Sequence, residues 1–333
     1  MTEGASAKEQ GPGFFSRLSE TLLKRQEAGI FVVAVALFVY FYFRNPAFLT
    51  TGNATTLAQF IAATAIVAMG LVMVMILGEI DLSVGQAFAF APIVMIIAYE
   101  QFFLVLPLAV LIGLLATALV GLVNGVIRVY FGVPSFVTTL GMFFLLGGLN
   151  VILMGGFPRP APEASWLKSA LGSYPWAGIL WAVALVVVMH LLLNHTRWGM
   201  HTFATGGNFI GAKEAGIKVD RIRIGNFMLC SMLGGFAGIL EAMRIDSIDP
   251  LAGGAETMFL GISAAVIGGT PLAGGIGTII GAFLGTTALS VLRNGFTLQG
   301  VSAFTFNVIL GIAVLVVMIL NVYVGRLRGG RRT

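Results

Sequence analysis

The chain has 333 residues, of which 58% are hydrophobic and 10% are charged, and its mean hydropathy is +0.97. A soluble domain averages about 25% charged residues, so this composition excludes an ordinary soluble fold and predicts a protein that buries its side chains in lipid. The formal net charge of +5 does not indicate a nucleic-acid partner, because no basic stripe is interleaved with aromatic residues; lysine and arginine are expected to mark cytoplasmic loops instead.

Charged residues gather near both ends of the chain and in one central block, and this distribution predicts the domain organisation. We expect a cytoplasmic N-terminal segment at 1–28, a transmembrane domain at 29–325 and a basic cytoplasmic tail at 326–333. The central polar block at 196–223 is expected to be a cytoplasmic loop of the transmembrane domain. The lipid bilayer is therefore the first partner that the sequence predicts.

Apolar runs separated by polar breaks predict the membrane spans. A helix needs about 20 residues to cross a hydrocarbon core of about 30 Å, and a shorter run predicts a broken or re-entrant helix. The expected spans are Gly29–Phe43, Leu57–Leu77, Gln86–Ala98, Phe102–Ile127, Phe136–Met154, Pro175–Leu193, Ile224–Met243, Thr257–Ile267, Gly274–Leu292 and Phe306–Val324. The sequence predicts an all-α, polytopic transmembrane helical bundle of about ten spans, with eight as the alternative if the short third and eighth runs do not cross.

Lysine and arginine predict the orientation. With a cytoplasmic N-terminus, the cytoplasmic side contains Arg128, Arg197, Lys213, Lys218, Arg221, Arg223 and the arginines of the tail. The opposite side receives only Arg44, Arg159, Lys168, Arg244 and Arg293. Both termini are therefore expected in the cytoplasm, which requires an even number of spans.

The most informative polar interruption is Gly-Glu-Ile-Asp-Leu-Ser-Val-Gly at 78–85, between two strongly apolar runs. A carboxylate at the centre of a membrane helix costs about 2.5–3.5 kcal/mol on insertion scales, so it normally lines a cavity or has a partner. Glu79, Asp81 and Ser83 are therefore candidates for a solute path or a gating loop. The alternative is a surface loop in which Asp81 or Ser83 caps the following helix.

Further polar side chains accompany the neighbouring apolar runs. The motif Pro-Ser-Phe-Val-Thr-Thr-Leu-Gly opens the fifth expected span, where Ser135 is placed to cap the helix and Thr138 and Thr139 lie one turn inside. The two threonine hydroxyls face either a solute or backbone carbonyls. Asn124 and Asn150 lie deep in apolar sequence, where interhelical hydrogen bonds of about 1 kcal/mol each are favoured over ligand contact.

The central polar block contains Thr205–Gly216, which predicts a turn and then a short helix that ends at Gly216. A helix in a cytoplasmic loop is suited to docking another protein. The alternative is an ordinary surface helix.

Glycines and the few cysteines and histidines point to packing rather than to chemistry. Gly121 and Gly125, Gly234 and Gly238, and Gly277, Gly281 and Gly285 are spaced by four residues, which predicts close helix packing. The glycine-rich segment 264–278 has no Gly-Lys-Ser or Gly-Lys-Thr, so no Walker-type nucleotide site is encoded. Cys230 is the only cysteine, and His190, His195 and His201 have no common ligand spacing, so we expect no metal site.

Four motifs, in this order, resemble the permease subunits of ribose- and xylose-type ABC sugar importers. They are Gly-Glu-Ile-Asp-Leu-Ser-Val-Gly, Pro-Ser-Phe-Val-Thr-Thr-Leu-Gly, Gly-Gly-Asn followed by a helix to Gly216, and Val-Ile-Gly-Gly-Thr-Pro-Leu-Ala-Gly-Gly-Ile-Gly-Thr. The resemblance covers about Asn45 to Val324. It implies a multi-pass permease that translocates a monosaccharide, such as a pentose, a hexose or a similar polyol, across the bacterial inner membrane and has no enzymatic activity of its own.

The resemblance also implies partners and site residues. The partners are a cytoplasmic ABC ATPase with two fused nucleotide-binding domains that binds ATP–Mg, a periplasmic or lipid-anchored sugar-binding protein, and a second permease copy. A coupling segment that docks the ATPase would contain Gly206, Gly207, Asn208, Glu214 and Gly216. The acidic residue usual at the start of that segment is absent, because Ile210-Gly211-Ala212 stands where Glu-Ala-Ala is common. The candidate path residues are Glu79, Asp81, Ser83, Asn124, Ser135, Thr138, Thr139 and Asn150; Glu79 replaces a glycine common in the ribose branch, which favours a different sugar branch.

An ion-coupled secondary transporter of a small polar solute is the alternative. Such proteins place ionisable residues near the membrane midplane, whereas the candidates Glu79, Asp81 and Glu241 all lie at predicted span ends. A membrane-embedded enzyme needs a paired nucleophile and base or a metal cluster, and the sequence predicts neither.

Overall fold

The computed structural model describes residues 26–163, 165–302, 305–312, 315–316 and 319. The expected N-terminal segment lies almost wholly outside this range, and the expected basic tail lies entirely outside it. The described residues form helices joined by short connections, with one small antiparallel pair of strands. This arrangement confirms the all-α class.

The elements follow one another along the chain as α2 (Gln26–Arg44), η1 (Pro46–Leu49), α3 (Thr51–Met75), α4 (Val84–Glu100), α5 (Leu106–Tyr130), α6 (Ser135–Met154), β1 (Arg159–Pro160), α7 (Trp166–Lys168), η2 (Ser169–Ser173), α8 (Ala177–His195), α9 (Arg197–Gly207), α10 (Phe209–Glu214), α11 (Val219–Ile245), β2 (Ser247–Ile248), α12 (Gly254–Ile267) and α13 (Ile279–Leu298). Within the described ranges, 7 helices are long and apolar enough to cross a membrane, namely α2, α3, α5, α6, α8, α11 and α13, and α4 and α12 are shorter apolar helices. The chain is thus a polytopic membrane protein.

Two expected spans begin later than predicted. The fourth run was placed from Phe102, but α5 begins at Leu106, because Phe103 has a φ of 53° and the chain reaches the helix through extended backbone. The ninth was placed from Gly274, but α13 begins at Ile279, because Gly274 and Gly275 both have a φ of 81°. The tenth, Phe306–Val324, lies partly outside the described residues, of which 305–312 are helical.

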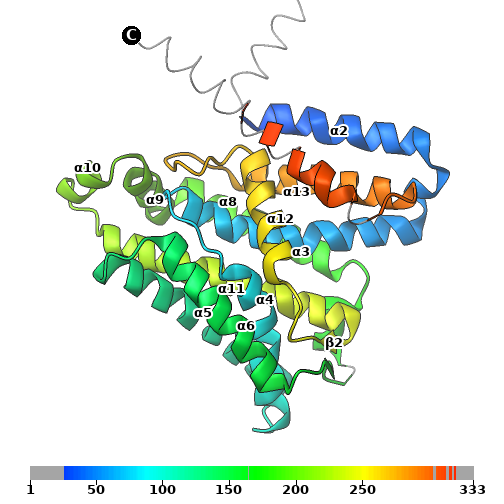
Figure 1. Ribbon diagram of the computed structural model, residues 1–333, viewed down its shortest axis with the longest axis horizontal. Helices are drawn as coiled ribbons and strands as arrows, with labels where there is room; N and C mark the ends of the chain where they lie inside the picture. Colours follow the sequence, from blue (N-terminus) through cyan, green and yellow to red (C-terminus); the bar gives the residue numbers. More distant parts are fainter. Residues whose placement is uncertain (1–25, 164, 303–304, 313–314, 317–318, 320–333) are drawn as a thin grey trace, which may run out of the picture.

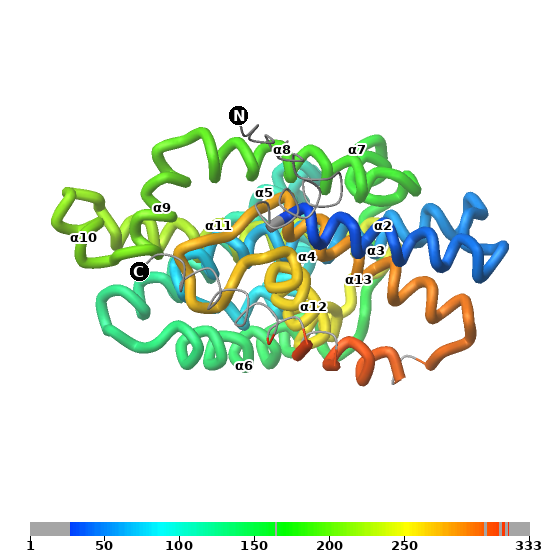
Figure 2. The backbone as a smooth tube through the Cα atoms, turned by 90° about the horizontal axis from the view of Figure 1, so that it is seen from above, coloured from blue at the N-terminus to red at the C-terminus, as the bar shows by residue number. Residues whose placement is uncertain are grey.

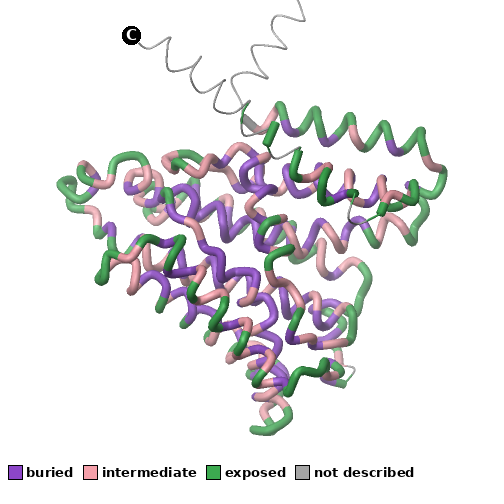
Figure 3. The backbone as a smooth tube through the Cα atoms, in the orientation of Figure 1, coloured by how far each residue is buried: buried purple, intermediate pink, exposed green. Residues whose placement is uncertain are grey.

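The core lies around α11, which packs against α3, α4 and α5. Buried residues are concentrated in these central helices, whereas most residues of the apolar helices α2, α6 and α8 are not buried (Figure 3). The spaced glycines permit this packing: Gly121 and Gly125 lie against the backbone of α11, Gly234 and Gly238 against α4, and Gly281 and Gly285 against the end of α12. The packing interpretation of these six glycines is confirmed. Gly277 precedes α13 and is not helical, so its place in the same helical strip is wrong.

The same order of elements occurs twice. From α3 to α5 the chain forms a long helix (α3), a break at 76–83, a short helix (α4) and another long helix (α5). From α11 to α13 it repeats this order, with a break at 246–253 and α12 as the short helix. Both breaks have the same length, and each contains Ile-Asp. A glycine follows four residues after each aspartate, at Gly85 in the first turn of α4 and at Gly253 directly before α12. In both, the aspartate Oδ1 accepts a hydrogen bond from the backbone N–H two residues on, at 2.9 Å in the first break and 2.8 Å in the second.

The two short helices begin beside each other. A side chain on Gly85 would run into the carbonyl oxygen of Gly254, and one on Gly253 would run into the carbonyl oxygen of Gly85. Gly234, near the middle of α11, packs against Val84 at the start of α4. The start of α4 thus packs on the middle of α11, and the start of α12 packs on the start of α4. The helices α9 and α10 lie near one end of α11, and β2 lies at the other end (Figure 1).

Candidate functional site: a buried helix break and the segment beside it

The break at 76–83 follows from a glycine that reverses the chain. Gly78 has a φ of 70°, which ends α3 and turns the backbone towards α4. The turn is held from another part of the chain, since the N–H of Gly275 donates to the carbonyl oxygen of Ile76 at 2.8 Å. The broken backbone is thus held inside the protein by a segment distant in sequence.

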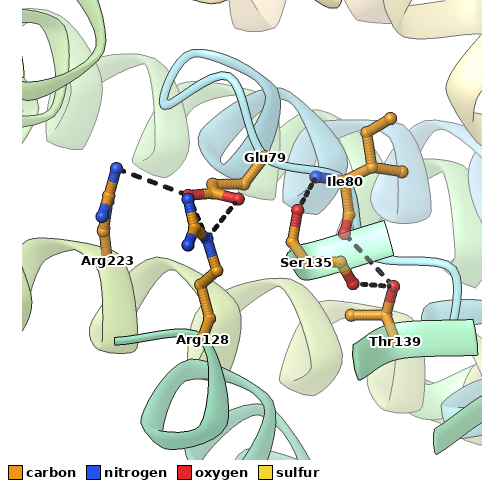
Figure 4. Close-up of polar contacts among 6 residues, drawn as sticks. All are labelled: Glu79, Ile80, Arg128, Ser135, Thr139 and Arg223. Atoms are coloured by element: carbon orange, nitrogen blue, oxygen red, sulfur yellow. Dashed lines mark hydrogen bonds and ion pairs between the residues drawn. The ribbon is translucent and has the colours of Figure 1, made fainter. Parts of the chain in front are cut away.

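Glu79 is enclosed by two arginines from different helices (Figure 4). Arg128 Nε of α5 donates to both carboxylate oxygens, at 2.8 and 2.9 Å, and Arg223 of α11 forms an ion pair with Oε1 at 3.5 Å. The Glu79 side chain is only 4% exposed. A buried carboxylate is tolerated when it is paired in this way, so Glu79 joins α5, α11 and the break.

Two hydroxyls of α6 satisfy the backbone of the break (Figure 4). The N–H of Ile80 donates to Ser135 Oγ at 3.2 Å, and the N–H of Leu82 donates to Thr139 Oγ1 at 3.0 Å. Thr139 also donates to the carbonyl oxygen of Ser135 at 2.8 Å. The prediction that Ser135 caps its own helix is wrong: Pro134 is the N-cap, and the serine hydroxyl is used by the break instead.

Asp81, Ser83 and Asn124 form a buried chain of hydrogen bonds. Asp81 Oδ1 accepts from Ser83 Oγ at 2.6 Å, and Asp81 Oδ2 accepts from Ser231 Oγ at 3.3 Å. Asn124 Nδ2 donates to Ser83 Oγ at 2.9 Å, which joins α5 to the break. Ser83 is the N-cap residue of α4, but its side chain makes no capping bond, so the alternative of Ser83 as a side-chain cap is also wrong.

Asn150 bonds the first turn of α4, where its Nδ2 donates to the backbone and side-chain oxygens of Gln86 at 3.2 and 3.3 Å. The Oδ1 atoms of Asn124 and Asn150 and the hydroxyl of Thr138 are buried without a hydrogen-bond partner. Both asparagines therefore bridge helices, as favoured from the sequence. The eight predicted path residues gather around the break and the start of α4, and their role in a path stays a prediction.

The predicted coupling segment forms two helices, α9 and α10. The expected turn begins later than Thr205, because α9 remains helical to Gly207 and Asn208 alone separates it from α10. The expected short helix is α10, and the Asn208 side chain caps it by accepting from the N–H of Gly211 at 2.9 Å. Gly216 has a φ of 81° and follows the end of α10, as predicted. Glu214, Gly216 and Gly207 are exposed.

The two glycines before Asn208 have different surroundings. A side chain on Gly206 would run into the carbonyl oxygen of Ile76, so α9 packs directly on the break. A side chain on Gly207 would meet nothing within 4 Å. Ile210, on α10, is 69% exposed. The surface formed by Gly207 and Ile210 is therefore open to another molecule.

Arg223 connects this surface to the break. Its guanidinium lies over the ring of Phe209, 4.2 Å from the centroid, while its other contact is Glu79. Sequence reasoning missed Arg128, Arg223, Phe209 and Gln86 as members of the site. One signal was available, since Arg128 and Arg223 each lie at the predicted cytoplasmic end of an apolar run, and Glu79 lies between two apolar runs without an evident partner.

No group of three or more His, Cys, Asp and Glu side chains in the described part of the chain is close enough to hold a metal ion. His190 and His195 have ring centroids 5.9 Å apart, and His190 Nδ1 contacts Asn194.

Known proteins resemble the chain along most of its length. Residues 53–319 match the family described as branched-chain amino acid transport system / permease component. The chain is similar to the xylose/arabinose import permease protein of Sulfolobus acidocaldarius, with 37% identity over 311 residues that cover 92% of this chain and 87% of that protein. It is also similar to the ribose import permease protein of Escherichia coli K12 (33% identity, 83% of this chain, 88% of that protein) and to that of Bacillus subtilis (31%, 89% and 92%). No solved structure matches the chain.

Proposed function

The chain belongs to the family of branched-chain amino acid transport system permease components, and we propose that it is the permease subunit of an ABC importer that carries a monosaccharide across the bacterial inner membrane. The observation that carries the proposal is its similarity, over nearly its whole length, to import permeases named for xylose, arabinose and ribose. The chain encodes no Gly-Lys-Ser or Gly-Lys-Thr loop, so the energy comes from a separate ATPase that holds ATP–Mg.

We propose ten crossings with both termini in the cytoplasm, and the contacts between connections support this topology. Connections assigned to the cytoplasm contact one another: the 76–83 break contacts Arg128, Arg223 and Gly275. Connections assigned to the opposite side also contact one another, as β1 pairs with β2 and Asn45 Nδ2 donates to the carbonyl oxygen of Leu298 at 3.0 Å. Crossings that alternate in direction from α2 to α13 account for both sets.

The proposed transmembrane domain extends over 29–325, with the coupling segment at 196–223. Gly206, Gly207, Asn208, Glu214 and Gly216 belong to this segment, and we assign it to ATPase docking. The open surface at Gly207 and Ile210 supports the assignment, because an exposed apolar side chain beside an open backbone is suited to a partner groove.

The proposed partners are a cytoplasmic ABC ATPase with two fused nucleotide-binding domains, an extracytoplasmic sugar-binding protein and a second copy of this chain. ATP-driven closure of the ATPase acts through α10. A coupling of this kind shifts an equilibrium only by differential interaction with two states. The stacked Phe209 and Arg223 and the ion-paired Glu79 provide a continuous contact from α10 to the break.

The tagged full chain should be purified in detergent from its native host and its partners identified by mass spectrometry. Recovery of a double-domain ATPase and a sugar-binding protein is expected. The Gly207→Trp variant should lose the ATPase, whereas Gly141→Trp, at an equally open glycine of α6, should retain it. Purification of the chain alone, under conditions that preserve a control ABC complex, would reject the proposal, and uptake driven by an ion gradient would then favour the secondary-transporter alternative.

A further inference from the structure

Helix α12 is too short to complete its proposed crossing by itself, so the non-helical residues before it must make up the rest. Its 14 residues span about 21 Å at a rise of about 1.5 Å per residue, against a hydrocarbon core of about 30 Å. Its start at Gly254 lies beside Gly85 at the start of α4, which itself packs on the middle of α11, so in the proposed topology the preceding residues 249–253 are non-helical at membrane depth. Such backbone is tolerated only where it is buried in protein or lines a water-filled cavity.

The first turn of α12 carries an exposed charge. Glu256 is 61% exposed, and its Oε1 pairs with Arg293 Nη2 of α13 at 2.9 Å. An exposed carboxylate at this depth is costly in lipid, so it faces water or another protein surface. The open side of α12 is therefore not a lipid-facing side.

Aromatic rings accompany this ion pair. The Arg293 guanidinium lies 5.4 Å from the ring centroid of Phe60 and 5.8 Å from that of Phe306. A small pocket at the same place is lined by Phe60, Thr64, Leu260, Leu289, Ser290 and Arg293. Charged, hydroxyl and aromatic groups thus meet between α3, α12 and α13.

Polar groups continue from there to α6. The Gln86 side-chain amide lies 3.8 Å from the position that a Cβ on Gly254 would occupy, and it contacts Asn150. Asn150 is fully buried, and its Oδ1 has no hydrogen-bond partner. We call Asn150, Gln86, Glu256, Arg293 and Phe60 the polar strip. In Figure 2, α6, α12 and the helical residues near 305–312 border the same edge of the molecule.

We propose that the polar strip lines the path of an uncharged monosaccharide from the extracytoplasmic side to the meeting point of α4 and α12. This inference rests on the proposed function. It places the sugar contacts in the outer half of the protein rather than at the 76–83 break. Of the eight path residues predicted from the sequence, it retains Asn150. Amide, carboxylate and guanidinium groups exchange hydrogen bonds with sugar hydroxyls, and the Phe60 ring covers the apolar face of a sugar ring. Broken helices that meet near the midplane are where transporters place their substrate.

Water access to the strip is measurable without knowing the sugar. Cys230 is the only cysteine in the sequence, so in a Cys230→Ala background each introduced cysteine is the single reactive thiol. A membrane-impermeant methanethiosulfonate should modify Glu256→Cys at least tenfold faster than Leu115→Cys of α5 in membranes. Leu115 is the matched control, because it is 57% exposed in the fold but lies on α5 in an apolar helix, outside the polar strip. Equally slow modification of both cysteines would overturn the inference.

Transport separates failure of the strip from failure of the proposed function. Uptake of labelled D-xylose, L-arabinose and D-ribose is first measured with the wild-type complex in proteoliposomes. If none of the three sugars is taken up, the result counts against the proposed function. The cysteine-modification rates then decide whether the polar strip is open to water. With wild-type uptake established, Glu256→Gln and Arg293→Gln should each reduce the initial rate at least tenfold with unchanged ATPase recovery. Glu100→Gln, at the exposed Arg159 pair outside the strip, should not reduce it. Unchanged rates and sugar preference in both strip variants would overturn the proposal.

Discussion

The two helix breaks of this protein have the same length and the same aspartate turn, but their surroundings differ. In the break at 76–83, Asp81 is fully buried and the backbone amides are satisfied by hydroxyls of α6. In the break at 246–253, Asp249 is part-exposed, Leu251 is exposed, and the chain is held mainly by the short strand pair. The same local motif therefore occurs in two environments. The first break is part of the buried core, whereas the second is partly exposed.

The difference arises from the neighbouring helices. The first break is covered by α5, α6 and α11, which supply arginine, hydroxyl and amide partners from three directions. The second break lies at the end of α11, where Asp246 pairs with Lys168 and the following residues lead into the exposed first turn of α12. Substitutions in the first break should therefore lower stability, and substitutions near the second should affect transport.

The largest effect is expected where the two short helices touch. Gly85→Val places a side chain against the carbonyl oxygen of Gly254, and main chain cannot move aside as a flexible side chain can. We expect a loss of about 3 kcal/mol or more in the free energy of unfolding, seen as little folded protein in size-exclusion chromatography. Gly141→Val, at an open position on α6, should purify normally. Normal yield of Gly85→Val would mean that the contact between α4 and α12 is not needed.

Removing the buried charge should have the next largest effect. Glu79→Ala leaves Arg128 and Arg223 without their carboxylate, and breaking a buried ion pair costs about 3 kcal/mol. Glu256→Ala removes an exposed partner of Arg293 and should cost under about 1 kcal/mol. Denaturation in mixed micelles measures both values. Equal losses in the two variants would contradict the distinction between the breaks.

The two equivalent aspartates allow a direct comparison. Asp81→Ala removes the acceptor for the Ser83 and Ser231 hydroxyls in a buried site, for an expected loss of about 2 kcal/mol. Asp249→Ala removes one bond to the Leu251 N–H, which water replaces at an exposed turn, so about 0.5 kcal/mol is expected. Thermal unfolding of both variants in the same detergent tests the order, and a larger effect at Asp249 would reverse the comparison.

Apolar run length predicted most of the fold, because the bilayer sets how many residues a helix needs. The starts of α5 and α13 were missed, since positive φ values at Phe103, Gly274 and Gly275 are set by local backbone geometry that composition does not reveal. In the site, Asn124 and Asn150 were correctly assigned to interhelical bonds. The partners of Glu79 were missed because Arg128 and Arg223 are distant from it in the sequence. Both arginines were interpreted only as markers of cytoplasmic loops, not as partners of a carboxylate.

Two adjacent threonines give the smallest and sharpest test. Thr139 accepts from the Leu82 N–H, so Thr139→Val leaves a buried amide without a partner and should cost about 1 kcal/mol. Thr138 is also buried, but its hydroxyl has no partner, so Thr138→Val should leave the free energy of unfolding unchanged or raise it. Thr138 is not part of the polar strip, so the two variants are compared by stability alone. Because both substitutions change the same atoms one residue apart, a difference in stability between them reports the hydrogen bond to the break.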